Sequence, residues 1–67
     1  MVPVSSSNIS AVGYDSVNRR LVIQFFSGTY EYTNVPESVY TGLISASSKG
    51  RYHDQFIKHS YTYRKIG

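Results

Sequence analysis

The fold is decided by the stretch from residue 20 to residue 33, which reads RLVIQFFSGTYEYT. Its first half is apolar and its second half alternates tyrosine with polar residues, so both halves favour strands. Ser27 and Gly28 lie between the two halves, and glycine permits the positive φ of a two-residue hairpin loop. We therefore predict an antiparallel hairpin with Ser27 and Gly28 as its loop, which pairs Phe25 with Tyr30.

The two faces of this hairpin differ in polarity. One face carries the large apolar and aromatic side chains, which are Leu21, Ile23, Phe25, Tyr30 and Tyr32. We take it as the core face, because residues two apart on a strand share a side. The opposite face is largely polar but includes Val22 and Phe26, which a covering layer or a second subunit would bury.

Strand signals precede the hairpin and helix signals follow it. Residues 9–14 predict a strand, and the polar residues 15–18 predict the turn that joins this strand to the hairpin. Pro36 suits a first helical turn, and apolar residues recur at helical spacing after it. We predict a main helix that ends at residue 47 or 48.

The C-terminal part of the chain predicts shorter elements. Gly50 is expected to cap the main helix, residues 53–58 predict a short second helix, and residues 61–66 alternate as an extended segment. The chain is therefore predicted to be a single α+β domain over residues 1–67. Its architecture is a three-stranded antiparallel β-meander packed by one main helix, followed by a short helix and an extended C-terminal tail.

Composition restricts the classes of function. The chain has 67 residues, no cysteine and a formal net charge of +3. Because so short a chain holds only one small core, we expect added stability from a ligand or from association into a homo-oligomer. The basic excess favours anionic partners. The chain shows neither a signal-peptide pattern nor an apolar run of membrane-spanning length, so we expect a cytoplasmic protein without membrane contact.

The segment Ser47-Ser48-Lys49-Gly50-Arg51 is the main candidate for phosphate binding. It places hydroxyls, two cations and a glycine just before an expected helix start, where backbone amides attract anions. Tyr52 follows it as a candidate for base stacking. The alternative is a capped helix end and a solvated turn. The segment lacks the glycine and lysine spacing of a nucleoside-triphosphate loop.

Tyrosines supply further candidates for base stacking. In the tail, Tyr61 and Tyr63 alternate with polar residues and precede Arg64, a mixture that is typical of nucleotide contacts. A half-buried edge strand has the same composition, so both interpretations stay open. Tyr30 and Tyr32 are similar to the aromatic pairs on nucleic-acid-binding sheets, but the predicted hairpin places them on the core face, which favours a structural role. Their hydroxyls would then reach the rim of the core, where a hydrogen bond to a ligand stays open.

Metal and catalytic sites are not expected. His53 and His59 are six residues apart, and Asp54 is their only nearby carboxylate, which is too few ligands for a metal. Ser60, His59 and Asp54 have side chains of the types that hydrolysis uses, but no nucleophile motif surrounds them. We therefore predict a non-enzymatic protein with no metal and no cofactor.

The order of several short motifs resembles the KTSC domain family. The residues that carry this resemblance are Val4-Ser5-Ser6-Ser7, Ile9, Gly13-Tyr14-Asp15, Leu21-Val22-Ile23-Gln24-Phe25, Gly28-Thr29-Tyr30-Glu31-Tyr32, Val35-Pro36, Ala46-Ser47-Ser48-Lys49-Gly50-Arg51-Tyr52 and Ile57. Tyr30-Glu31-Tyr32 corresponds to the central Tyr-x-Tyr motif of the family. The family takes its name from the C-terminus of some lysyl-tRNA synthetases and also occurs as free-standing small proteins, including proteins of bacteriophage. The resemblance implies RNA binding only through the attachment to a synthetase.

Two functions of different classes follow from these observations. The first is a module that binds a phosphate-bearing ligand, either RNA or a small or cyclic nucleotide. Its expected ligand-binding residues are Ser47, Ser48, Lys49, Gly50, Arg51, Tyr52, Tyr61, Tyr63 and Arg64. In a phage protein such a module would sequester a signalling nucleotide in a pocket between subunits. The alternative is a protein-protein interaction module, in which Val22, Phe26 and the sheet edge dock a host or self subunit.

Overall fold

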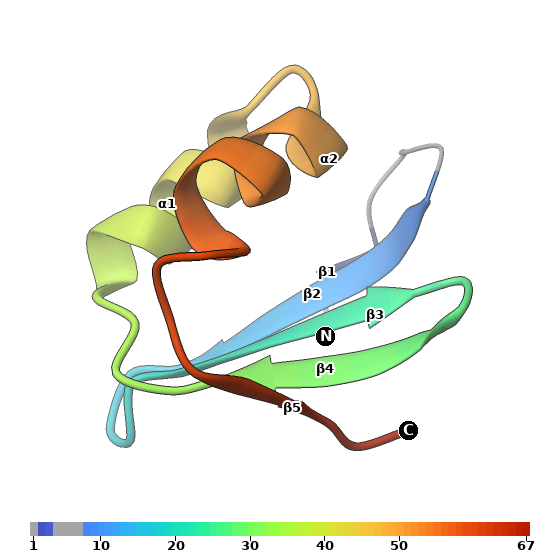
Figure 1. Ribbon diagram of the computed structural model, residues 1–67. Coiled ribbons are helices and arrows are strands. Elements are labelled where there is room, and N and C mark those ends of the chain that lie inside the picture. The colour runs from blue at the N-terminus through green and yellow to red at the C-terminus, as the bar shows by residue number, and fades with distance from the viewer. Residues whose placement is uncertain (1, 4–7) are drawn as a thin grey trace.

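The structure is a computed structural model that describes residues 2, 3 and 8–67 (Figure 1). Its elements are β1 (Val2–Pro3), β2 (Ile9–Asp15), β3 (Arg20–Phe25), β4 (Gly28–Tyr32), α1 (Glu37–Ser45), α2 (Lys49–Tyr52), the π-helix η1 (His53–Ile57) and β5 (Tyr63–Lys65). Within the described residues, five strands form one antiparallel sheet in the order β1-β2-β3-β4-β5. The helices lie together over one face of this sheet (Figure 1).

The α+β class and the antiparallel sheet are confirmed, but the prediction of three strands was too low. The extended tail becomes strand β5, which pairs with β4 at the edge of the sheet. This pairing continues past β5, since Ile66 N donates to Thr29 O at 2.8 Å. The other added strand, β1, is only two residues long and pairs with β2, so it carried no period-two pattern to detect. The lead-in at residues 5–7 lies outside the described residues.

The hairpin forms as predicted, but its register differs from the prediction by two residues. Phe25 pairs with Gly28 and Ile23 with Tyr30, so Phe26 and Ser27 form the loop. Gly28 belongs to β4 instead, where a Cβ would lie 2.7 Å from Lys65 Cε. The glycine therefore permits the close approach of the C-terminal segment. A shift of two residues keeps every strand side chain on its predicted face.

Phe26 is the exception to the predicted faces, because it lies in the loop and not on the sheet. Its side chain is 69% exposed. The prediction that Phe26 and Val22 form an apolar pair on the outer face is therefore wrong for Phe26. Val22 does lie on the outer face and is half-buried there.

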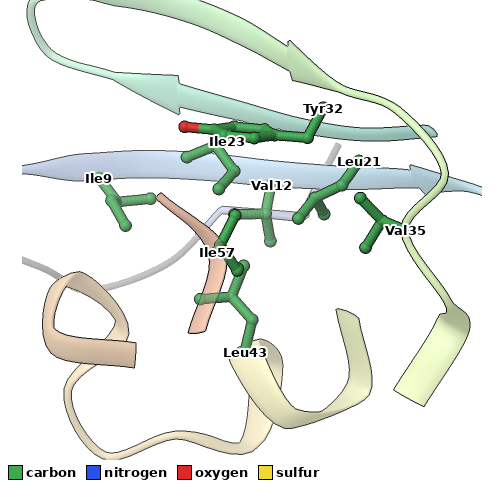
Figure 2. Packing of buried hydrophobic residues seen from close by; sticks show 8 residues of the cluster. All are labelled: Ile9, Val12, Leu21, Ile23, Tyr32, Val35, Leu43 and Ile57. Carbon is green, nitrogen blue, oxygen red and sulfur yellow. The ribbon is translucent and has the colours of Figure 1, made fainter. Parts of the chain in front are cut away.

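The core lies between the sheet and the helices (Figure 2). Its buried side chains are Ile9, Val12, Leu21, Ile23, Tyr32, Val35, Leu43 and Ile57. Three of the five predicted core-face residues belong to this cluster, whereas Phe25 and Tyr30 pack against its margin and are only partly buried. At this margin of the core the rings of Phe25 and Tyr30 therefore remain partly accessible.

The connection between the helices differs from the prediction. Helix α1 ends at Ser45, two or three residues before the predicted end, because Ala46 is extended with ψ of 139°. Gly50 is not a C-terminal cap but lies inside α2, which begins after Ser48, whose Oγ accepts from Arg51 N at 3.4 Å. A Cβ at Gly50 would lie 3.0 Å from Asn8 Oδ1. The predicted second helix is confirmed as η1, although α2 continues directly into it.

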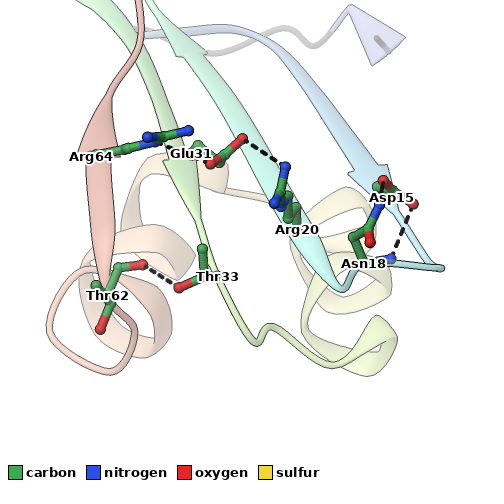
Figure 3. A network of polar contacts seen from close by, with 7 residues as sticks. All are labelled: Asp15, Asn18, Arg20, Glu31, Thr33, Thr62 and Arg64. Atoms are coloured by element: carbon green, nitrogen blue, oxygen red, sulfur yellow. Dashed lines mark hydrogen bonds and ion pairs between the residues drawn. The ribbon is translucent and has the colours of Figure 1, made fainter.

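Polar contacts shape the β2–β3 turn and the outer face of the sheet (Figure 3). In the turn, Asp15 Oδ1 accepts from Val17 N at 3.0 Å, and Asp15 Oδ2 accepts from Asn18 Nδ2 at 2.8 Å. These contacts lower the pKa of Asp15 below its usual value, with the Asn18 side chain as the main cause. The polar turn predicted at residues 15–18 is therefore confirmed. Within residues 2–3 and 8–67, no helix has both the length and the apolarity to cross a bilayer.

Candidate ligand site

An open pocket of about 220 Å³ lies where β3, β4 and β5 meet the segment around η1. Its lining residues are Phe25, Ser27, Tyr30, Tyr32, His53, Lys58 and Tyr63. Five of these seven residues carry aromatic rings, one is a lysine and one is a serine. We call it the aromatic pocket.

The antiparallel sheet brings the tyrosine rings together. Tyr30 and Tyr32 lie two residues apart on β4, so they share the helix-covered face, and Tyr63 on β5 pairs with Tyr32. The Tyr63 ring centroid lies 5.8 Å from that of Tyr30 and 5.6 Å from that of Tyr32. Because Tyr63 is 52% exposed at the edge of the sheet, its ring is available to a ligand.

A histidine and a tyrosine provide the buried polar contact of the pocket. His53 is 7% exposed and Tyr32 is 3% exposed, and the distance from His53 Nε2 to Tyr32 Oη is 2.7 Å. Burial lowers the pKa of His53 below its usual value. Burial also raises the pKa of Tyr32 to about 12. At neutral pH both side chains are therefore uncharged.

Lysines supply positive charge around this uncharged interior. Lys58 lines the pocket directly. Lys65 pairs with Tyr30 across β4 and β5, and its side chain passes over Gly28 at the hairpin end. The nearby carboxylate of Asp54 is 68% exposed, with Oδ1 at 3.4 Å from His53 Nδ1. The two lysines exceed this single negative charge, which favours an anionic group beside the rings.

The predicted phosphate segment lies elsewhere, along a second hollow of about 220 Å³. This hollow is lined by Ala46, Ser47, Ser48, Arg51, Tyr52, Gln55 and Phe56. The structure thus brings four of the predicted residues together. Lys49 and Gly50 are not in this lining: Lys49 Nζ donates to Ala46 O at 2.8 Å, and Gly50 faces Asn8. The Tyr52 ring packs against Gly42 and against Phe56, with ring centroids 4.8 Å apart for the aromatic pair.

The predicted tail residues are divided between the two faces of the sheet. Tyr61 packs against the core and Tyr63 lines the aromatic pocket. Arg64 lies on the outer face, where its Nε is 3.3 Å from Glu31 Oε1, and Glu31 Oε2 is 3.9 Å from Arg20 Nη1 (Figure 3). A single ligand therefore does not reach Tyr63 and Arg64 from the same face.

Sequence reasoning missed most of the aromatic pocket. Phe25 and Tyr32 were assigned to the core face, and His53 was considered only as a metal ligand. Ser27 was predicted only as a loop residue, and Lys58 was not among the expected ligand-binding residues. The Tyr30-Glu31-Tyr32 alternation signalled the shared face, but it gave no indication that His53, 21 residues away, would contact Tyr32. Among the described residues, no group of three or more His, Cys, Asp or Glu side chains is placed to hold a metal ion.

Residues 5–61 match the KTSC domain. The chain belongs to the KTSC domain family. Its fold is similar to the crystal structure of a KTSC domain protein from Yersinia pestis, with a TM-score of 0.94, 53% sequence identity, and coverage of 97% of this chain and 93% of that one. The Tyr-x-Tyr motif of the KTSC resemblance thus supplies two of the pocket's rings.

Two kinds of relative share the KTSC domain. A protein of Tsukamurella paurometabola is 42% identical over 59 residues, which cover 87% of this chain and 88% of that protein. The lysine–tRNA ligase of a Nostoc species is 39% identical over 61 residues, which cover 90% of this chain but only 11% of the ligase. The KTSC domain therefore exists both as nearly the whole of a small protein and as a small part of a synthetase.

Proposed function

We propose that this KTSC domain is a binding module for a phosphate-bearing ligand with a nucleobase, either RNA or a small nucleotide. The observation that carries the proposal is the aromatic pocket, in which five rings and Lys58 line one opening. Rings provide stacking surfaces for a base, and an ammonium group beside them neutralises a phosphate.

The half-exposed Tyr63 ring is the expected stacking surface. Stacking of one base on an aromatic side chain contributes about 1 to 3 kcal/mol. Tyr30 supports this ring from the neighbouring strand, with its own centroid 5.7 Å from that of Phe25 in an edge arrangement. A base that stacks on Tyr63 therefore meets a surface that is already packed, which reduces the entropy lost on binding.

The second hollow extends the proposal for longer RNA. Ser47, Ser48 and Arg51 line it together, and the Arg51 side chain is exposed. Arg51 lies in α2, which continues directly into η1, where His53 lines the aromatic pocket. We expect it to contact a backbone phosphate of RNA, whereas a mononucleotide requires only the aromatic pocket.

Isothermal titration calorimetry with AMP, adenosine and a short oligoadenylate tests the proposal. We expect AMP to bind more tightly than adenosine, and Lys58→Ala to remove this difference, because Lys58 contacts the phosphate. Tyr63→Ala should weaken the binding of both AMP and adenosine. Arg64→Ala is the matched control, because it removes the same charge from the outer face of the sheet.

The outcome of this titration separates the parts of the proposal. Arg51→Ala should weaken the oligoadenylate and leave AMP unchanged. If none of the ligands binds at millimolar concentration, or if Arg64→Ala weakens AMP as much as Lys58→Ala does, the pocket assignment is wrong. Native mass spectrometry of the purified protein adds the subunit number and any retained nucleotide, and retention of a cyclic nucleotide by a multimer would support the sequestering role.

A protein-protein interaction module is the second candidate, favoured by the exposure of Phe26. This side chain is 69% exposed in the β3–β4 loop, where a partner would bury it. The outer face next to it is polar, with Glu31 between two arginines, so we expect a small interface centred on the loop. In this case Phe26→Asp should abolish partner binding and leave AMP affinity unchanged. Retained partner binding together with a lower AMP affinity would exclude the interaction module.

A further inference from the structure

We propose that the Tyr32 hydroxyl is the specificity-determining group of the aromatic pocket and accepts a hydrogen bond from the exocyclic amino group of a nucleobase. The inference rests on the proposed function and narrows its ligand to amino-bearing bases. It follows from the contacts of His53 and Tyr32, which fix the direction in which the tyrosine hydroxyl donates.

The two ring nitrogens of His53 have different surroundings. Nδ1 lies 3.4 Å from the Asp54 carboxylate, and Nε2 lies 2.7 Å from Tyr32 Oη. A neutral imidazole carries one ring proton, and a carboxylate oxygen only accepts hydrogen bonds. The proton is therefore more stable on Nδ1, beside the negative charge, and Nε2 keeps its lone pair.

This tautomer decides what Tyr32 offers to a ligand. Because Nε2 only accepts, the phenol must use its single hydrogen to donate to His53, and Tyr32 keeps that hydrogen because its pKa is raised to about 12. The oxygen lone pairs are left as acceptors. Among the described residues, no buried side-chain nitrogen or oxygen lacks a partner, so the contact with His53 already satisfies this pair in the unliganded protein.

The other polar groups of the pocket do not discriminate in this way. The hydroxyls of Ser27, Tyr30 and Tyr63 rotate to donate or accept, and the Lys58 ammonium only donates, which suits phosphate. Tyr32 differs because His53 holds its hydrogen in one direction. A base with an amino group at this position gains a hydrogen bond, and a base that lacks the amino group leaves the acceptor unused.

The test compares AMP with purine riboside 5′-monophosphate, which differs from AMP only by the missing amino group. We expect AMP to bind the wild-type protein about 3- to 10-fold more tightly, the range of one added hydrogen bond. In Tyr32→Phe the ratio should fall to about one. Tyr30→Phe, the same change two residues away in the same pocket, should keep the wild-type ratio.

Each outcome bears on a different part of the argument. Equal wild-type affinities for the two nucleotides would overturn the role of Tyr32 while the proposed function stands. Failure of both nucleotides and of the oligoadenylate to bind would overturn the proposed function and this inference together. An AMP preference that persists in Tyr32→Phe would place the discriminating group elsewhere.

Nitrogen-15 NMR of the histidine rings tests the tautomer without a ligand or a variant. At neutral pH we expect the proton of His53 on Nδ1 and an unprotonated Nε2. The exposed His59 serves as the internal reference. A proton on Nε2 would make Tyr32 the acceptor from His53 and its hydroxyl a donor to the pocket, which would overturn the proposal even if Tyr32→Phe does not fold.

Discussion

The hydrogen bond between Tyr32 and His53 predicts a measurable loss of stability in Tyr32→Phe. The substitution deletes one oxygen and leaves His53 Nε2 without its partner at 2.7 Å, in a histidine that is 7% exposed. A net hydrogen bond contributes about 0.5 to 1.5 kcal/mol, and a buried polar atom left unsatisfied costs about 1 to 3 kcal/mol. From these two ranges we expect a loss of about 2 kcal/mol in the free energy of unfolding.

Urea denaturation followed by circular dichroism measures this loss, since the chain contains no tryptophan for fluorescence. Tyr30→Phe is the matched control, because it makes the same change on the same strand and face. No hydrogen bond of the Tyr30 hydroxyl is formed within residues 2–3 and 8–67, so we expect a loss below about 0.5 kcal/mol. Equal stabilities of the two variants would show that the contact with His53 contributes nothing.

The remaining two predictions concern pH and the outer face. Burial lowers the pKa of His53 below the usual value of 6.5. Between these two pKa values the unfolded chain binds more protons than the folded protein, so the free energy of unfolding should fall as the pH drops below about 6.5. Urea unfolding at several pH values checks this prediction, and in His53→Asn the free energy of unfolding should depend less on pH. A stability that rises on acidification would contradict the prediction. Glu31→Gln should lower the free energy of unfolding by at most about 1 kcal/mol, because Arg20 and Arg64 are half or more exposed. Calorimetry should find its AMP affinity unchanged, and a large loss of affinity would place the ligand on the outer face.

The hairpin shows which part of a sheet is encoded locally. The alternation in residues 29–33 predicted the correct face for Tyr30 and Tyr32, because the side-chain period of a strand depends only on neighbouring residues. The register was wrong by two residues, since Gly28 was taken as a loop residue. Gly28 instead lies in β4, where the absence of a side chain leaves room for Lys65, 37 positions later in the chain.

The candidate site also has one part that the local sequence predicted and another that depends on strand pairing. Tyr63 was predicted as a ligand residue from its neighbours in the tail, and it does line the aromatic pocket. Arg64 was predicted with it, but adjacent residues of a strand point to opposite faces, and the pairing of β5 with β4 directs Arg64 to Glu31. The predicted phosphate segment did bring Ser47, Ser48 and Arg51 to one hollow, because they lie close together in residues 47–51 of the chain.

The amino-acid sequence alone fixed the class of the domain, its family and the faces of its hairpin, since these depend on patterns within short stretches of chain. Tertiary packing settled the register, the placement of the tail as an edge strand and the contact between Tyr32 and His53. These features join residues that are far apart in the chain. They depend on which long-range contacts bury apolar surface while pairing polar groups, and no local pattern records that choice.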